Sequence, residues 1–163
     1  MARIEQSFSF EEFDSIDQLQ QQDRVLLEKA REVTADAYAP YSGFLVGAAA
    51  RMNNLDIITG TNQENASYPV GICAERTLLA AAGTQYPDTP IVAMAISYHN
   101  TRIDKMSHFP ISPCGMCRQA LHEFEERTGQ PMRLILSGQE GKIWVIEQAS
   151  LLLPLAFSGS QLR

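Results

Sequence analysis

The spacing of apolar residues divides the first part of the chain into a helix and a strand hairpin. Between residues 17 and 38, apolar side chains recur every three or four positions, the period of an amphipathic helix, and Pro40 ends the pattern. Residues 44–52 and 56–60 are predicted to be two strands joined by a polar turn. Because residues 47–50 are all glycine or alanine, we expect another element to pack closely against the first strand.

The rest of the chain continues this alternation of helices and strands. The predicted order is helix, strand, helix, two strands and a short helical segment, at residues 72–82, 91–97, 114–127, 132–137, 142–146 and 150–153. Gly83 is expected to end the first of these helices. The unbroken apolar run at 91–97 indicates a central, buried strand, and a polar segment at 99–111 follows it. This order predicts an α/β fold with a mixed five-stranded sheet and helices on both faces.

The beginning of the chain differs from the remainder. Residues 1–22 are predicted to be an N-terminal arm, and residues 23–163 a single domain. The arm is acidic in part and carries Phe8, Phe10 and Phe13. It is interpreted either as a partly ordered appendage or as a segment whose aromatic side chains pack on another subunit.

Composition and charge restrict the class of protein. Of the 163 residues, 45% are hydrophobic and 20% are charged, which is ordinary for a folded globular domain. The net charge is −6 and no long run of Lys or Arg occurs, so a nucleic-acid polymer is not an expected partner. The chain has neither a signal-peptide pattern nor a stretch of about 18 apolar residues, so we expect a cytoplasmic protein without a membrane partner.

The three cysteines of the chain lie in two short segments. Cys73 stands at one predicted helix start, and Cys114 and Cys117 stand at another, three residues apart and on one helix face. Three thiols cannot all pair as disulfides, so in a reducing compartment they are expected to be free or bound to metal. The positive end of a helix dipole favours the thiolate form, which zinc binds.

The number of thiols favours a zinc site with an open position. A structural site closes with four protein ligands, whereas a catalytic site keeps three and a water. A fourth protein ligand would have to be one of His99, His108 and His122. Glu75 lies two residues after Cys73, where its carboxylate could transfer protons to and from the water. The alternatives are a structural zinc module, which has no use for Glu75, and a redox dithiol, which would hold no metal.

Two arginines adjoin the proposed ligands. Arg76 and Arg118 each follow directly on a cysteine segment. Three thiolates outweigh the charge of one zinc ion, so a hydrogen bond from either guanidinium to a ligand sulfur would offset the excess negative charge. The alternative for each is a solvated surface side chain.

Four segments follow one another along the chain: Tyr-Ser-Gly-Phe-Leu-Val-Gly-Ala-Ala at 41–49, Thr-Gly-Thr-Asn-Gln-Glu-Asn-Ala-Ser-Tyr at 59–68, Ile-Cys-Ala-Glu-Arg-Thr at 72–77 and Ser-Pro-Cys-Gly-Met-Cys-Arg-Gln at 112–119. With these segments, the chain from residue 39 to residue 157 resembles the short, zinc-dependent cytidine deaminases that act on free nucleosides. The resemblance implies the three-layer cytidine deaminase-like fold, with 23–163 as the catalytic domain. The N-terminal arm and the segment 99–111 are longer than is usual for the family.

The resemblance also implies a role for each site residue. One zinc ion per chain would be held by Cys73, Cys114 and Cys117, with Glu75 as the proton shuttle. Substrate would be bound by Asn62 and Glu64 at the sugar hydroxyl, by Phe44 and the Ala74 backbone at the pyrimidine, and by Phe157 from a neighbouring subunit. A homotetramer with shared active sites is implied.

The implied activity is hydrolytic deamination of cytidine and 2′-deoxycytidine to the corresponding uridines, with release of ammonia, as in pyrimidine salvage. Related deaminases act on other substrates, such as blasticidin S or a polynucleotide. The sugar-binding pair Asn62 and Glu64 argues against the first of these. A cysteine rather than a histidine as first ligand, together with the acidic net charge, argues against the second.

Overall fold

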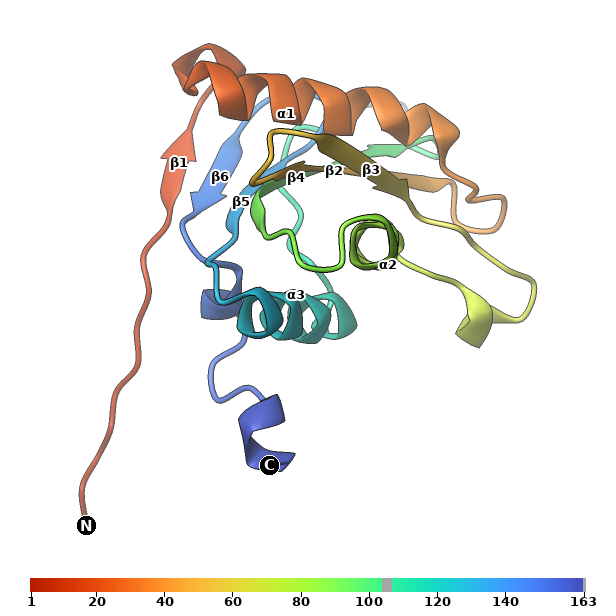
Figure 1. Cartoon of the computed structure of the whole chain (residues 1–163). Coiled ribbons are helices and arrows are strands. Elements are labelled where there is room, and N and C mark those ends of the chain that lie inside the picture. Colours follow the sequence, from red (N-terminus) through yellow and green to blue (C-terminus); the bar gives the residue numbers. More distant parts are fainter. Residues whose placement is uncertain (104–106, 163) are drawn as a thin grey trace.

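Six strands form one mixed sheet within residues 1–103 and 107–162, which the computed structural model describes (Figure 1). The spatial order of the strands is β1-β6-β5-β4-β2-β3. Their bounds are Glu11–Phe13 for β1, Phe44–Met52 for β2, Ile57–Thr61 for β3, Ile91–Asn100 for β4, Arg133–Ser137 for β5 and Ile143–Ile146 for β6. β4 and β5 are parallel, and the other neighbouring pairs are antiparallel.

Helices cover both faces of this sheet and bury two hydrophobic clusters. The α-helices are α1 at Gln21–Glu32, α2 at Ala74–Gln85 and α3 at Gly115–Thr128. Short 3-10 segments lie at Ile16–Gln18, Val33–Asp36, Tyr68–Val70, Ala149–Leu152 and Gly159–Leu162. α1 lies on one face of the sheet, and α2 and α3 lie on the other (Figure 1). The predicted three-layer α/β fold is therefore confirmed.

Small residues let the helices approach the sheet closely. A Cβ atom added to Gly47 of β2 would lie 2.3 Å from the carbonyl oxygen of Ala30 in α1. One added to Gly60 of β3 would lie 2.6 Å from the carbonyl oxygen of Ala74, the first residue of α2. The expectation of close packing against the first hairpin strand is confirmed, and the N-terminus of α2 is held directly against β3.

The prediction of five strands was wrong because part of the arm joins the sheet. β1 pairs antiparallel with β6, with Glu12 opposite Trp144. The Glu12 carboxylate accepts hydrogen bonds from Nε1 of Trp144, at 2.8 Å, and from Nζ of Lys142. The ring of Phe10 lies 5.3 Å from that of Trp144. A strand of three residues is too short to show an alternating pattern, so only tertiary pairing reveals it.

Several element boundaries also differ from expectation. The predicted helix at 17–38 is α1 at Gln21–Glu32 between the 3-10 segments Ile16–Gln18 and Val33–Asp36. α2 continues past Gly83 to Gln85, and a Cβ at Gly83 would meet the guanidinium of Arg127 at 3.1 Å, so this glycine makes room for a contact from α3. β4 extends to Asn100, so the predicted polar segment at 99–111 begins inside a strand, and its residues 104–106 lie outside those described. α3 begins at Gly115, with Cys114 as its N-cap.

None of the helices in the described ranges combines the length and the apolar content that a membrane crossing requires.

Candidate active site

The three cysteines meet where the N-termini of α2 and α3 come together. Cys73 is the N-cap residue of α2, and Cys114 is the N-cap residue of α3. The Sγ atom of Cys114 lies 3.9 Å from that of Cys73 and 3.5 Å from that of Cys117, and all three sulfurs lie within 4.8 Å of one another. Tetrahedral zinc with Zn–S bonds of about 2.3 Å holds its sulfurs about 3.8 Å apart, so this cluster fits the ion.

The histidines that sequence reasoning kept as possible fourth ligands lie elsewhere. Among the described residues, the cluster that could hold a metal consists of the three cysteines alone. Nδ1 of His108 is 3.8 Å from Glu140, and Nε2 of His122 is 3.8 Å from Glu126. A site with three protein ligands and an open position is therefore what the side chains form.

The thiols differ strongly in acidity. A hydrogen bond with the Cys117 thiol is the main cause that lowers the pKa of Cys73 to about 6, and the charge of Arg76 helps in the same direction. The same bond, together with burial, raises the pKa of Cys117, whose side chain is fully buried. The lowered pKa favours the thiolate form of Cys73, which is the form that binds zinc, and metal binding would displace the remaining thiol protons.

Glu75 is a buried carboxyl beside this cluster. It lies in the first turn of α2, and only 5% of its surface is exposed. Burial raises the pKa of Glu75 above its ordinary value, because the charged form loses its hydration. A hydrogen bond with the Cys117 thiol opposes part of this rise and places the Glu75 carboxyl beside the cluster. A carboxyl with a raised pKa can both accept and return a proton near neutral pH.

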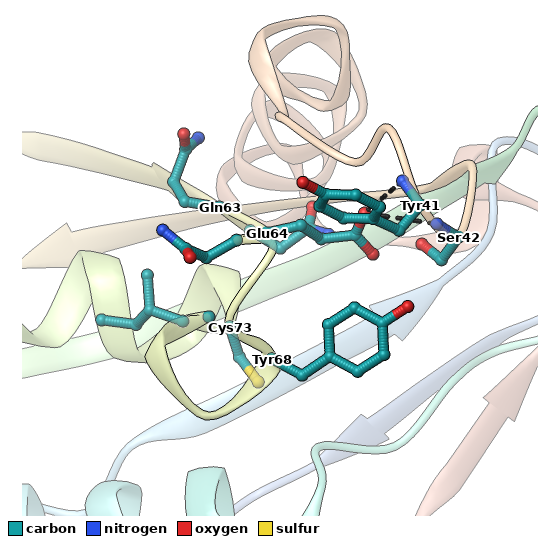
Figure 2. A pocket seen from close by; sticks show the side chains of 10 residues that line it. Tyr41, Ser42, Gln63, Glu64, Tyr68 and Cys73 are labelled. Carbon is teal, nitrogen blue, oxygen red and sulfur yellow. Dashed lines mark hydrogen bonds between the residues drawn. The ribbon is translucent and has the colours of Figure 1, made fainter.

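A cavity of about 410 Å³ opens beside Cys73 (Figure 2). Asn62 and Glu64 both line it, so the structure brings the predicted sugar-binding pair next to a predicted zinc ligand. The Asn62 amide is held by β2: its Oδ1 accepts from the N–H of Val46 at 2.7 Å, and its Nδ2 donates to the carbonyl of Phe44 at 2.9 Å.

The Glu64 carboxylate is held by the turn that precedes β2. Its Oε2 accepts from the backbone N–H groups of Tyr41, at 2.8 Å, and Ser42, at 3.2 Å (Figure 2). Hydrogen bonding by the Ser42 side chain is the largest of the causes that lower the pKa of Glu64. Glu64 is therefore an ionised acceptor that faces the cavity at neutral pH.

The other predicted substrate residues lie near the site or away from it. Ala74 is fully buried at the start of α2. The ring of Phe44 stacks on that of Tyr98 in β4, with centroids 4.8 Å apart, and does not line the cavity. Phe157 is 56% exposed in the C-terminal segment, where its carbonyl accepts from Nε2 of Gln119. Within one chain, Phe44 and Phe157 are therefore outside the described cavity.

The two arginines support the cysteine segments differently. Arg118 donates from Nε to the carbonyl of Pro113 at 2.8 Å and from Nη1 to the carbonyl of Leu152 at 3.0 Å. It thus holds the Cys114 segment to the C-terminal segment through backbone groups. Arg76 acts on Cys73 through its charge. A hydrogen bond from either arginine to a ligand sulfur stays a prediction.

Sequence reasoning did not single out several residues of the cavity wall. They are Tyr41, Ser42, Gln63, Asn65, Tyr68, Gly71 and Ile72. The ring centroids of Tyr41 and Tyr68 lie 5.9 Å apart in the cavity wall. Most of these residues belong to the quoted family segments, and that membership was the signal that pointed to them. Tyr41 acts on Glu64 through its backbone N–H group, which every residue except proline possesses, so its residue type carries no sign of this role. Ser42 acts through both its backbone N–H group and its side chain.

Comparisons with known proteins agree with this geometry. The family model described as the cytidine and deoxycytidylate deaminase zinc-binding region matches residues 20–129. A cytidine deaminase of Halalkalibacterium halodurans is 36% identical over 140 residues, which are 86% of this chain and 97% of that protein. The crystal structure of cytidine deaminase from Burkholderia pseudomallei superposes with a TM-score of 0.71 at 36% identity, covering 85% of this chain and all of the other. The cytidine deaminase structure from Mycobacterium tuberculosis gives 0.63 at 28% identity, covering 85% and 98%. The chain belongs to the cytidine deaminase family.

Proposed function

We propose that this protein deaminates free cytidine and 2′-deoxycytidine by hydrolysis, giving uridine or 2′-deoxyuridine and ammonia. The observation that carries the proposal is the position of the three-cysteine cluster and buried Glu75 beside a cavity that Asn62 and Glu64 line. A cavity of about 410 Å³ lies within the usual range for small-molecule sites. Relatives of matching length that are named cytidine deaminases support the substrate class.

Proton transfer is assigned to Glu75. Zinc held by Cys73, Cys114 and Cys117 would supply a Lewis acid that makes water nucleophilic near neutral pH. The Glu75 carboxylate takes a proton from the water as it attacks C4 of the base. Glu75 then gives this proton to the ring nitrogen next to C4. It next takes the second water proton from the hydroxyl now on C4 and passes it to the amino group, which leaves as ammonia as the C4 carbonyl forms. The raised pKa of Glu75 supports both directions of transfer.

The sugar is assigned to the Glu64 side of the cavity. An ionised carboxylate is a strong acceptor for a hydroxyl donor, and the Glu64 carboxylate is fixed by two backbone N–H groups. Asn62 holds the beginning of β2 and adds its own polar atoms to the wall. We propose that the Phe44 ring and the Ala74 backbone contact the pyrimidine, because Phe44 follows the turn that holds Glu64 and Ala74 follows the zinc ligand Cys73.

We also propose a homotetramer in which each active site is shared between subunits. Support comes from large apolar side chains that are exposed on the single chain, among them Tyr68, Val70, Leu155 and Phe157. Contact with another copy would remove such side chains from water. Phe157 would reach the site of a neighbouring subunit. We propose that 1–22 is an arm whose strand β1 joins the sheet of a catalytic domain at 23–163.

The cellular setting follows from the thiols. The three cysteines are free and must stay reduced to bind a metal, so we propose a reducing, cytoplasmic location. The net charge of −6 supports free nucleosides rather than a nucleic-acid polymer as substrates.

The proposed activity is tested by metal analysis of the purified protein together with an ultraviolet absorbance assay on cytidine, 2′-deoxycytidine and cytosine. We expect about one zinc per chain, turnover of both nucleosides, and little turnover of cytosine, because cytosine lacks the sugar that Glu64 binds. Zinc without nucleoside turnover would contradict the proposal, and so would turnover after complete removal of zinc.

Phe157→Ala is expected to weaken the assembly or to raise KM for cytidine by several-fold, because it removes an aromatic ring assigned to a neighbouring site. Light scattering coupled to size-exclusion chromatography and steady-state kinetics measure the two effects. Leu162→Ala, in the same terminal segment and also exposed, is the matched control and should change neither. A Phe157→Ala variant with unchanged mass and KM would exclude Phe157 from the site.

A further inference from the structure

We propose that Arg102 and Thr101, which directly follow β4, are positioning residues for sugar recognition. They contact the turn at 41–43, and this turn holds the Glu64 carboxylate. The inference rests on the proposed binding of a sugar hydroxyl by Glu64. It gives a role to the beginning of the 99–111 segment.

The link from Arg102 to Glu64 runs through one peptide group. The guanidinium of Arg102 donates from Nη2 to the carbonyl of Tyr41. That carbonyl belongs to the same planar peptide unit as the N–H of Ser42, which donates to Oε2 of Glu64 at 3.2 Å. A donor on the carbonyl fixes the plane of this peptide and strengthens its N–H as a donor, since hydrogen bonds in a chain polarise one another.

Thr101 holds the other end of the turn. Its backbone N–H and its Oγ1 both donate to the carbonyl of Gly43, at 2.9 and 3.0 Å. Gly43 has a φ of +68°, and a Cβ added there would lie 2.7 Å from Oγ1 of Thr101 and 2.9 Å from Cγ of Arg102. The two side chains therefore lie directly over a turn that only glycine can form without strain.

Arg102 acts on the substrate through Glu64, because the residues that line the cavity include Glu64 but not Arg102. Its positive charge is one of the causes that lower the pKa of Glu64, after the hydrogen bonds from Ser42 and Tyr41. Loss of the Arg102 side chain should therefore weaken binding of the sugar hydroxyl by Glu64 and leave proton transfer at Glu75 unchanged. The expected signature is a change in KM with little change in kcat.

The test compares cytidine with 2′,3′-dideoxycytidine, which lacks both ring hydroxyls. For Arg102→Ala we expect KM for cytidine to rise about five- to tenfold, with kcat within about twofold of wild type. KM for the dideoxynucleoside should not change, because the bond that Arg102 supports is already absent. Arg102→Lys keeps the positive charge and a hydrogen-bond donor, so it should raise KM for cytidine less than Arg102→Ala does. Thr101→Val, which removes a single hydroxyl, should raise KM for cytidine by a smaller factor and should also leave KM for the dideoxynucleoside unchanged.

Two further comparisons make the outcome decisive. In a Glu64→Ala background, Arg102→Ala should add no further rise in KM, since residues that act through one group are not additive. Ile103→Ala, an exposed neighbour in the same segment, is the control and should behave like wild type. The inference would be overturned by an equal rise in KM for both nucleosides, by a fall in kcat alone, or by effects of Arg102→Ala and Glu64→Ala on KM that add. A wild-type protein that does not deaminate cytidine would instead overturn the proposed function.

Discussion

Glu75→Gln is expected to retain zinc and fold and to lower kcat for cytidine by a factor of about 10² to 10⁴, the usual contribution of a positioned general acid–base group. The substitution preserves shape in a position that is only 5% exposed. It replaces a group that can accept and return a proton with an amide that can do neither. Because the sulfurs hold the metal, zinc content should remain about one per chain.

The pH dependence of folding stability should also differ between wild type and Glu75→Gln. Burial raises the pKa of Glu75 in the folded state above its ordinary value, so the folded protein binds the proton more tightly than the unfolded chain does. Wild-type stability should therefore fall as pH rises from the ordinary carboxyl pKa through the raised one, and Gln should lack this decline. Chemical unfolding of both metal-free proteins at about pH 5 and about pH 8 measures the difference.

The control for Glu75→Gln is Glu123→Gln, which makes the same chemical change at an exposed position on α3. It should match wild type in kcat, zinc content and pH dependence of stability. A Glu75→Gln variant with full activity would contradict the proton-transfer role. One that lost its zinc would show that Glu75 supports the metal instead.

Cys114→Ala is expected to abolish zinc binding and, with it, activity above background. The Cys114 sulfur lies 3.5 Å from that of Cys117 and 3.9 Å from that of Cys73, so it is central to the cluster. Two thiols and solvent make a much weaker site than three thiols. Zinc content is read by elemental analysis, so the prediction does not depend on the activity assay.

Metal removal gives an independent measurement of the same site. Zinc that binds only the folded state raises the melting temperature, so a chelator should lower Tm of the wild type. Tm of Cys114→Ala should be insensitive to the chelator and should equal that of the chelated wild type, apart from the small packing change. Met116→Ala, exposed in the same helical turn, is the control and should respond like wild type. A Cys114→Ala variant that is zinc-replete and active would contradict the ligand assignment.

The predicted elements agree with the structure where local pattern and tertiary packing impose the same requirement. Strand β2 begins and ends where the sequence predicted, because its apolar residues and its small residues face helices on both sides of the sheet. The end of α2 was predicted three residues too early, because a glycine often follows the end of a helix but Gly83 here accommodates Arg127. β1 was missed because its stability comes from pairing with β6 rather than from its own three residues.

What the sequence by itself determined is the chemistry. Three thiols, two of them three residues apart, with Glu75 two residues after the third, predict a zinc site with an open position because ligand type and helical spacing are local properties. What only the tertiary structure decided is how distant segments meet. The lack of a side chain at Gly60 lets α2 pack directly against β3, and the N-termini of α2 and α3 come together. Backbone groups of the turn at 41–43 hold Glu64, and Arg102 donates a hydrogen bond to the same turn. Backbone hydrogen bonds and the close packing of elements depend on the path of the whole chain, so they cannot be predicted from the type of any single residue.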